Sequence, residues 1–216
     1  MSTPATLEAI NGLTDDIAQL WLAPQAPYHW QAGDYLLIEL ADEKRPFSIA
    51  NAPNPAGRIE LHIRHTHDDW YNRLFQHTAG ATLQLSAPQQ QYPPPQGDHP
   101  VLFVAGGTGF APFKAHLEVM LQNGFAQPIR FYWGARSQAD LYQDDLMRTW
   151  AANHPGLTYI PVLSEETWPG RCGLVADAVL EDMDTLSAWE IYLCGPWPMV
   201  EDARRRFTAQ GASLIH

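Results

Sequence analysis

A glycine-rich turn between a predicted strand and a predicted helix is the stretch of this chain best suited to hold an anion. Gly106, Gly107 and Gly109 follow the apolar run 101–105 and precede apolar residues at helical spacing. Glycines let the backbone come close to a ligand, and the free N–H groups of a first helical turn attract negative charge. The turn is neither a Gly-x-Gly-x-x-Gly fingerprint nor a Walker A loop, so a pyrophosphate site and a turn without a ligand both stay open.

Two further motifs combine residue types that can bind or position a ligand. Arg45-Pro46-Phe47-Ser48 joins a cation, a rigid proline and a hydroxyl on a predicted strand, although a surface arginine and a buried serine explain it equally well. Cys194-Gly195-Pro196-Trp197-Pro198-Met199 follows another predicted strand, and its cysteine also fits a small buried apolar side chain.

Histidine and cysteine spacing gives little support to a metal centre. His62, His65 and His67 alternate on one predicted strand, but no carboxylate or cysteine set completes a site, and alternation with solvent on one face accounts for them better. Cys172 and Cys194 form no CxxC pattern, which excludes a cysteine-ligated iron–sulfur centre within these 216 residues. We therefore expect no bound metal.

Charge and composition restrict the partners. The net charge of −11 disfavours nucleic acid and anionic membrane, so a phosphate-bearing ligand must be held by local backbone N–H groups and a few placed cations. No apolar run approaches the roughly 18 residues of a membrane-spanning helix. The start Met1-Ser2-Thr3-Pro4 carries no charged leader or apolar signal segment. These features predict a cytoplasmic protein.

The elements that position these motifs change character along the chain. Short strands separated by turn signals predict a small closed barrel in the first part, with strands at 5–10, 17–22, 34–40, 47–50, 59–64 and 82–85. Trp70, Leu74 and His77 share one face of a predicted helix at 69–78, which would plug one end of the barrel. The Pro-rich stretch 87–100 cannot form a regular ladder, and we interpret it as a polyproline linker rather than a docking site for a proline-binding domain.

The linker separates predicted domains at 1–97 and 98–216. In the second domain, strands at 101–105, 129–134, 157–162 and 189–194 alternate with helices at 112–122, 139–152, 175–180 and 198–208. That alternation predicts a parallel sheet with helices on both faces. Ligands of such sheets bind beyond the carboxyl ends of the strands, where residues 106–109, 134–137 and 194–196 fall.

The order and separation of the three motifs resemble the ferredoxin–NADP reductase superfamily, and more closely the bacterial NAD(P)H:flavin oxidoreductases of the Fre type. The shared stretches cover nearly the whole chain and include Gly33-Asp34-Tyr35, 45–50, Leu61-His62-Ile63, 101–110, Tyr132-Trp133-Gly134 and 154–157. The resemblance implies a small antiparallel Greek-key β-barrel that binds flavin, followed by a parallel-sheet α/β domain that binds NADH or NADPH.

The resemblance also implies roles for the motif residues in moving a hydride from nicotinamide to flavin N5. Ser48 would hydrogen-bond N5, Arg45 would contact the ribityl chain or a phosphate, and Tyr35 would wall the flavin site. Further flavin-site positions are Pro46, Phe47, Leu61, His62 and Ile63. Thr108 would lie near both rings, and Cys194 would flank the nicotinamide. Further coenzyme positions are Gly106, Gly107, Gly109, Pro112, Arg136, Gly195, Pro196 and Met199. Because a hydride travels directly, no histidine is given an acid–base role.

Departures from the family pattern shape the remaining expectations. No adenine-clamping motif stands out in the Pro-rich loop, so the flavin (FMN, FAD or riboflavin) would be held by its isoalloxazine and ribityl parts and would dissociate. Asp140, Asp144 and Asp145 near Arg136 favour NADH, with dual use open. Relatives continue into an aromatic tail where this sequence stops at His216, which implies a more open nicotinamide side or closure by a partner.

Three functions follow from these expectations. The first is an NAD(P)H-dependent flavin reductase that supplies reduced flavin for iron(III) reduction or for a flavin-dependent oxygenase. The second is an electron-transfer reductase component with bound flavin and a protein acceptor, which the missing iron–sulfur cysteines weaken. The third is a non-catalytic flavin- or dinucleotide-binding sensor.

Overall fold

The computed structural model describes residues 2–66 and 68–216, and the chain divides by its internal contacts into two compact units. The first unit consists of Met1–Pro94 and Ala111–Val119, and the second of Pro95–Phe110 and Met120–His216. Helix α2 (Phe110–Asn123) therefore contributes residues to both units. His67, one of the three alternating histidines, lies outside the described residues.

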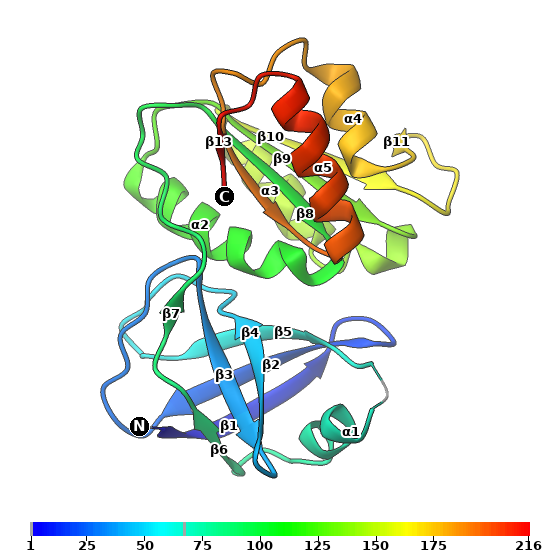
Figure 1. The fold of residues 1–216 in the computed structure, drawn as a ribbon. Coiled ribbons are helices and arrows are strands. Elements are labelled where there is room, and N and C mark those ends of the chain that lie inside the picture. The colour runs from blue at the N-terminus through cyan, green and yellow to red at the C-terminus, as the bar shows by residue number, and fades with distance from the viewer. Residues whose placement is uncertain (1, 67) are drawn as a thin grey trace. The chain divides into compact units, whose positions relative to one another are not determined.

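A seven-stranded antiparallel sheet forms the first unit (Figure 1). Its strands are β1 (Thr3–Gly12), β2 (Ile17–Pro24), β3 (Asp34–Leu40), β4 (Glu43–Ser48), β5 (Ile59–Arg64), β6 (Thr82–Leu85) and β7 (Gln89–Gln90). The main order is β4-β3-β6-β1-β2-β5, and a bridge between Ile49 and Leu61 joins its two ends. This closure pairs the edge strands and confirms the predicted Greek-key barrel.

Alternation of apolar residues along the strands builds the barrel core. Leu36 and Ile38 of β3 point inward, as do Leu61 and Ile63 of β5, and all four are fully buried or nearly so. Helix α1 (Asp69–Phe75) adds Trp70 and Leu74 to the same core, as its sequence pattern predicted. Its N-cap is Asp68, whose side chain accepts a hydrogen bond from the backbone N–H of Tyr71.

The Pro-rich segment departs from the prediction in one respect. Gln89–Gln90 pair with Asp34 and Tyr35 at the start of β3, because these two glutamines precede the proline run and keep their N–H groups. Tyr92 is buried and packs edge-on against Phe113 of α2, with ring centroids 5.2 Å apart. This part of the segment therefore belongs to the barrel and is not a free linker.

A six-stranded parallel sheet forms the second unit, as the alternation of strands and helices predicted. Its strands are β8 (Val101–Gly106), β9 (Ile129–Ala135), β10 (Leu157–Leu163), β11 (Arg171–Cys172), β12 (Glu190–Cys194) and β13 (Leu214–Ile215). The order is β11-β10-β9-β8-β12-β13, so β8 lies between β9, the next strand in the chain, and β12. The order of the strands reverses direction between β8 and β12.

Different side chains cover the two faces of this sheet. Helices α4 (Val175–Asp182) and α5 (Trp197–Ala209) pack on one face against Leu102 and Val104 of β8 (Figure 1). Phe103, Phe131 and Trp133 of the central strands form an aromatic cluster with Phe110 of α2. Helix α3 (Asp144–Asn153) begins after a separate 3-10 turn at Gln138–Asp140, so the single helix predicted at 139–152 is interrupted. None of the described helices is long and apolar enough to cross a membrane.

Replacing Gly33 by alanine is expected to destabilise the fold more than the same change at Gly80. Both glycines have positive φ, +87° and +94°, but a Cβ on Gly33 would lie 2.2 Å from the carbonyl oxygen of Tyr92, whereas one on Gly80 meets no described atom within 4 Å. The positive φ alone costs about 1–2 kcal/mol, and steric overlap adds about 1–3 kcal/mol at Gly33. Urea denaturation measures both variants, and equal losses would contradict the close contact.

Candidate functional site

The turn after β8 presents backbone N–H groups at the carboxyl end of the second sheet. Gly107–Gly109 form one 3-10 turn that leads directly into α2, and neither this turn nor the helix has a side-chain N-cap. Gly107 has φ +54°, which favours glycine. Trp133 stacks on Phe110 with ring centroids 4.1 Å apart and donates from Nε1 to the carbonyl oxygen of Gly107 at 3.0 Å. The turn is thus held in a form that suits an anion.

The segment after β12 packs directly against this turn. A Cβ on Gly109 would lie 2.1 Å from the carbonyl oxygen of Cys194, and one on Gly106 would lie 2.5 Å from the sulfur of Met199. The absence of side chains at these two glycines therefore leaves room for Cys194 and Met199, in addition to any ligand that the turn binds. Thr108 and Cys194 are both half-buried. The structure brings together the two motifs that lie almost 90 residues apart in sequence.

The reversal of strand order falls at these two motifs. Ala105 of β8 and Cys194 of β12 are opposite each other at the carboxyl ends of adjacent strands. In parallel sheets with helices on both faces, dinucleotides bind in the crevice outside such a reversal. Helix α5 also begins here, at Trp197, without a side-chain N-cap. The residues therefore fit a nicotinamide dinucleotide.

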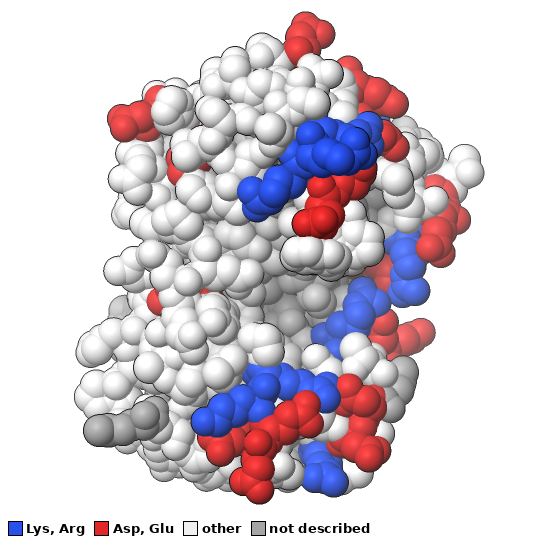
Figure 2. All heavy atoms as spheres, in the orientation of Figure 1, with Lys and Arg blue, Asp and Glu red and all other residues white. Residues whose placement is uncertain are grey.

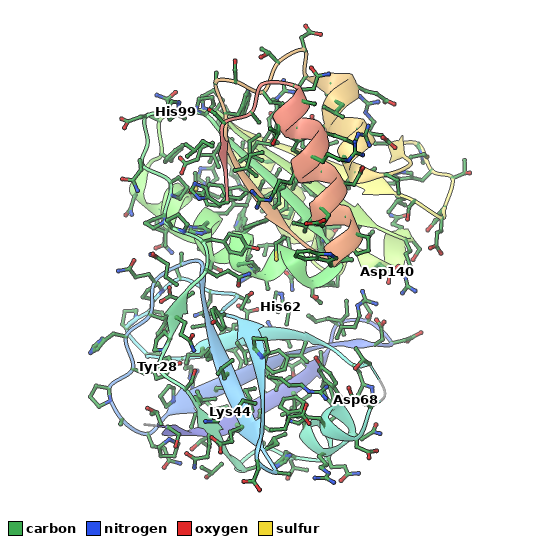
Figure 3. The ribbon with its side chains drawn as sticks, in the orientation of Figure 1. Tyr28, Lys44, His62, Asp68, His99 and Asp140 are labelled. Carbon is green, nitrogen blue, oxygen red and sulfur yellow. The ribbon has the colours of Figure 1, made fainter. Side chains whose placement is uncertain are left out.

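The remaining coenzyme positions take different places. Arg136 follows β9, is more than half exposed and pairs with Asp140 at 3.4 Å (Asp140 is labelled in Figure 3). Pro112 is buried in the first turn of α2, and Gly195 and Pro196 form the exposed to half-buried link between β12 and α5. Burial would raise the pKa of Asp140, but hydrogen bonds from Ser137 and the charge of Arg136 lower it, so this carboxylate is ionised at neutral pH.

Alternation on β4 separates the residues of the Arg-Pro-Phe-Ser motif. Ser48 lies opposite Tyr35 of β3, both are half-buried, and among the described residues the Ser48 hydroxyl makes no hydrogen bond. Tyr35 donates its hydroxyl proton to Gln89 Oε1 at 2.8 Å. Phe47 points the other way and stacks on Trp70 in the core, with ring centroids 5.6 Å apart. Pro46 is exposed. A ligand at this end of β4 meets the Ser48 hydroxyl but only the backbone of Phe47.

The guanidinium of Arg45 is bound by acidic and aromatic side chains of its own unit. It donates to Glu43 at 2.7 Å and to Asp68 at 2.6 Å, and it lies about 5 Å from the ring centroids of Trp70 and Tyr71. The hydrogen bond from Arg45 lowers the pKa of Asp68. Basic and acidic side chains lie beside one another on the face shown in Figure 2, consistent with these ion pairs. The positive charge of Arg45 is therefore already balanced.

Sequence reasoning missed a buried polar cluster behind β5. Leu61 and Ile63 face the core, but Glu60 and His62 lie on the other side of the strand and are only 3% and 5% exposed, so the expectation of solvent there is wrong. His62 Nε2 is 2.9 Å from Glu60 Oε1, and Lys114 Nζ is 2.7 Å from Glu60 Oε2. The described residues hold no group of three or more side chains placed to bind a metal. A lysine four residues before a glutamate in a largely apolar helix was the available signal.

Neighbouring charges control protonation in this cluster. Burial alone would raise the pKa of Glu60, but the hydrogen bond from His62 and the positive charge of Lys114 lower it to about 2. Burial lowers the pKa of His62, and this effect exceeds the opposing influence of Glu60, so the ring is neutral at pH 7. The cluster therefore carries an ionised carboxylate behind the strand that the sequence assigned to the flavin.

Comparison with known proteins identifies the family. The sequence profile of the oxidoreductase NAD-binding domain matches residues 103–205, which hold both turns of the second unit. An NAD(P)H-flavin reductase of Vibrio harveyi is 31% identical over 219 residues, an alignment that covers 96% of this chain and 92% of that protein. The chain belongs to the NAD(P)H:flavin oxidoreductase family. Its motifs predicted this family.

Other relatives extend beyond this chain. The CDP-6-deoxy-L-threo-D-glycero-4-hexulose-3-dehydrase reductase of Yersinia pestis is 35% identical over 214 residues, which are 96% of this chain and only 65% of that protein. The crystal structure of the Amycolatopsis cytochrome P450 reductase GcoB superposes with a TM-score of 0.91 at 29% identity, covering all of this chain and 68% of GcoB. These likenesses place the chain in the ferredoxin–NADP reductase superfamily and confirm its fold class.

Acid is expected to remove the stabilising contribution of Glu60. The folded pKa of about 2 lies below the usual 4.5, so the ionised carboxylate stabilises the fold above about pH 4.5, and this contribution is lost as the pH falls towards 2. The gap in unfolding free energy between wild type and Glu60→Gln should be on the order of 3 kcal/mol at pH 7 and should narrow in acid. Denaturant titrations at several pH values measure it. The control is Glu39→Gln, in a surface pair with Lys44, which should lower the unfolding free energy by less than about 1 kcal/mol. A difference in unfolding free energy between wild type and Glu60→Gln that stays the same at every pH would refute the low pKa of Glu60.

Proposed function

We propose that this reductase passes a hydride from NADH to N5 of a weakly held flavin, which then leaves as reduced flavin for iron(III) reduction or for a flavin-dependent oxygenase. The observation that carries the proposal is the pairing of Arg45 with Glu43 and Asp68. A flavin phosphate that approached Arg45 would have to displace carboxylates already in hydrogen-bond contact with it. The flavin is therefore held through its isoalloxazine and ribityl parts, and it exchanges with solution.

On the flavin side, the residues at the end of β4 and in the middle of β5 make the contacts. The Ser48 hydroxyl donates a hydrogen bond to N5, and Tyr35 walls the site from the neighbouring strand. Phe47 contributes through its backbone, because its ring is packed in the core. Leu61, His62 and Ile63 likewise present backbone groups, since their side chains are buried. When bound, the flavin accepts at N5 the two electrons and one proton that leave nicotinamide C4 together.

On the coenzyme side, backbone N–H groups hold the dinucleotide. The uncapped turn Gly107–Gly109 binds the pyrophosphate, and Thr108 and Cys194 line the nicotinamide. Gly106 and Gly109 permit the contact with Cys194 and Met199 that shapes this site. The chain needs no proton donor for the transfer itself, because the hydride moves directly between the two rings.

Carboxylates after β9 favour NADH over NADPH. The ribose of a dinucleotide lies near the end of the strand that follows the glycine turn in sheets of this kind. The N–H and hydroxyl groups of Ser137 donate to Asp140 Oδ2 at 3.1 and 3.0 Å, and the N–H of Gln138 donates to Glu166 at 2.7 Å. A 2′-phosphate would meet two carboxylates and compete with them for these donors and for Arg136.

A second candidate function is electron delivery to a protein acceptor. The relatives from Yersinia pestis and Amycolatopsis are named as reductases of a dehydrase and of a cytochrome P450. This chain spans 65% and 68% of those proteins, so a further segment or a separate partner would have to carry the electrons onward. In that case the flavin would stay bound between turnovers.

Purified protein should be colourless and should oxidise NADH only when flavin is added. We expect saturable dependence on riboflavin, a KM for FMN no lower than that for riboflavin because Asp68 and Glu43 occupy Arg45, and a higher kcat/KM with NADH than with NADPH. Visible spectra and stopped assays at 340 nm, with riboflavin, FMN or FAD, provide the measurements. A yellow protein that turns over only with a protein acceptor would favour the second candidate.

Ser48→Ala is expected to slow flavin reduction without weakening NADH binding. Loss of one hydrogen bond to the reacting atom should lower kcat by about tenfold. The matched control is Ser86→Ala, because Ser86 Oγ accepts from Leu37 N at 2.9 Å within the same unit and serves the barrel alone. The control should lose stability with an unchanged kcat. Unchanged turnover in Ser48→Ala would refute the N5 contact.

A further inference from the structure

The buried ammonium group of Lys114 has three acceptors. Lys114 lies in the second turn of α2 with its side chain only 6% exposed, and Nζ is 2.7 Å from Glu60 Oε2, 2.7 Å from Glu118 Oε1 and 3.1 Å from the carbonyl oxygen of Ala50. An ammonium carries three N–H donors, so each donor has one acceptor. The cation is therefore fixed in position as well as in charge.

Two of these acceptors lie on or just after the strands that are proposed to contact flavin: Glu60 is in β5, and Ala50 follows β4. Ala50 comes two residues after Ser48, and Glu60 immediately precedes Leu61. The two segments are joined to each other by the bridge between Ile49 and Leu61, and by the hydrogen bond from Ala50 N to the carbonyl oxygen of Glu60 at 2.8 Å. The ammonium group of Lys114 thus donates hydrogen bonds both to Ala50, just after β4, and to Glu60 in β5.

Glu118 and Asn51 complete the connection. Glu118 Oε2 accepts from the N–H of Ala52 at 2.7 Å, so this carboxylate links the chain after β4 to Lys114. Asn51 Oδ1 accepts from the N–H of Glu60 at 2.8 Å, and its amide group donates to the carbonyl oxygen of Arg58 at 2.9 Å. The turn from β4 into β5 is therefore held by directional bonds at several consecutive residues.

Packing alone does not account for charges at this place. Apolar side chains of similar volume fill such positions without the desolvation penalty that buried ions carry, and they often give equal or greater stability. Hydrogen bonds differ from apolar contacts because they specify distance and direction, and a fully satisfied buried network favours one arrangement of the backbone. The distinctive effect of the Lys114 cluster is thus on geometry.

We propose that Lys114, with Glu60 and Glu118, is a positioning residue for the flavin. It acts through the backbone of residues 48–52 and 60–63, and it sets the Ser48 hydroxyl and the backbone of Leu61 and Ile63 at the spacing that the isoalloxazine ring requires. This inference rests on the flavin placement proposed above. It assigns to helix α2 a part in flavin binding that none of its residues performs by direct contact.

The test separates geometry from stability. Lys114→Met leaves the buried Glu60 and the half-buried Glu118 without their cation, and it should lower the melting temperature strongly. The triple variant Lys114→Met, Glu60→Gln, Glu118→Gln removes all three charges, so its melting temperature should recover towards wild type. We expect the triple variant to bind riboflavin about tenfold more weakly, the usual loss when the support of a ligand-binding group is removed, with its NADH affinity unchanged. Lys114→Arg keeps the charge but not the compact geometry, so its riboflavin affinity should lie between those of the wild type and the triple variant.

Riboflavin fluorescence titration and calorimetry with NADH measure these affinities without turnover. A stable triple variant with wild-type riboflavin affinity would overturn the proposal and leave the cluster as an anchor for α2. Equal losses of riboflavin and NADH affinity would overturn it too, because the effect would be general. Failure of the wild type to reduce added flavin would instead refute the proposed function, so the two failures are distinguishable. The surface pair variant Lys44→Met, Glu39→Gln is the control and should leave every value unchanged.

Discussion

The first unit depends on charge balance around one buried ammonium group. Lys114 neutralises Glu60 and Glu118 in a region that is almost closed to solvent, where any of the three ions alone would be strongly destabilising. The apolar core of the barrel keeps the strands together but tolerates small shifts of side chains. The ionic cluster tolerates far less, because its hydrogen bonds hold only at short distances and in set directions. Strand geometry at the proposed flavin site thus depends on the polar network behind β5.

The second unit meets a comparable need by steric means. The turns after β8 and β12 approach each other so closely that a single methyl group at Gly109 would overlap the backbone at Cys194. Aromatic stacking of Phe110 on Trp133 then fixes the start of the helix that follows. The two units therefore fix their backbones differently: hydrogen-bonded ions position the strands of the first unit that are proposed to contact flavin, and the absence of side chains allows the close approach of the turns proposed to bind the coenzyme.

Local patterns predicted the elements well, whereas long-range polar contacts stayed hidden. The bounds of β3, β5 and β6 followed from apolar alternation between clear turn signals, and the glycine turn stood at the predicted strand end. The pairing of Lys114 with Glu60 joins residues 54 positions apart, and that of Arg45 with Asp68 joins residues 23 apart. No periodicity encodes such partners, because they depend on how strands and helices meet in space. Side chains alternate along a strand, so the position of β4 alone predicts that Phe47 and Ser48 point to opposite sides.

Helix α2 has a consequence for how such reductases can be recombined. Its residues Ala111–Val119 belong to the barrel by their contacts, although the barrel's remaining chain ends at Pro94. A fragment cut in the Pro-rich segment would lose Lys114 and Glu118 together, and it would leave the carboxylate of Glu60 buried without its cation. The first unit is therefore not formed by one continuous piece of sequence. A gene fusion or domain exchange that keeps this barrel intact has its crossover beyond Val119, inside what looks like the coenzyme half of the chain.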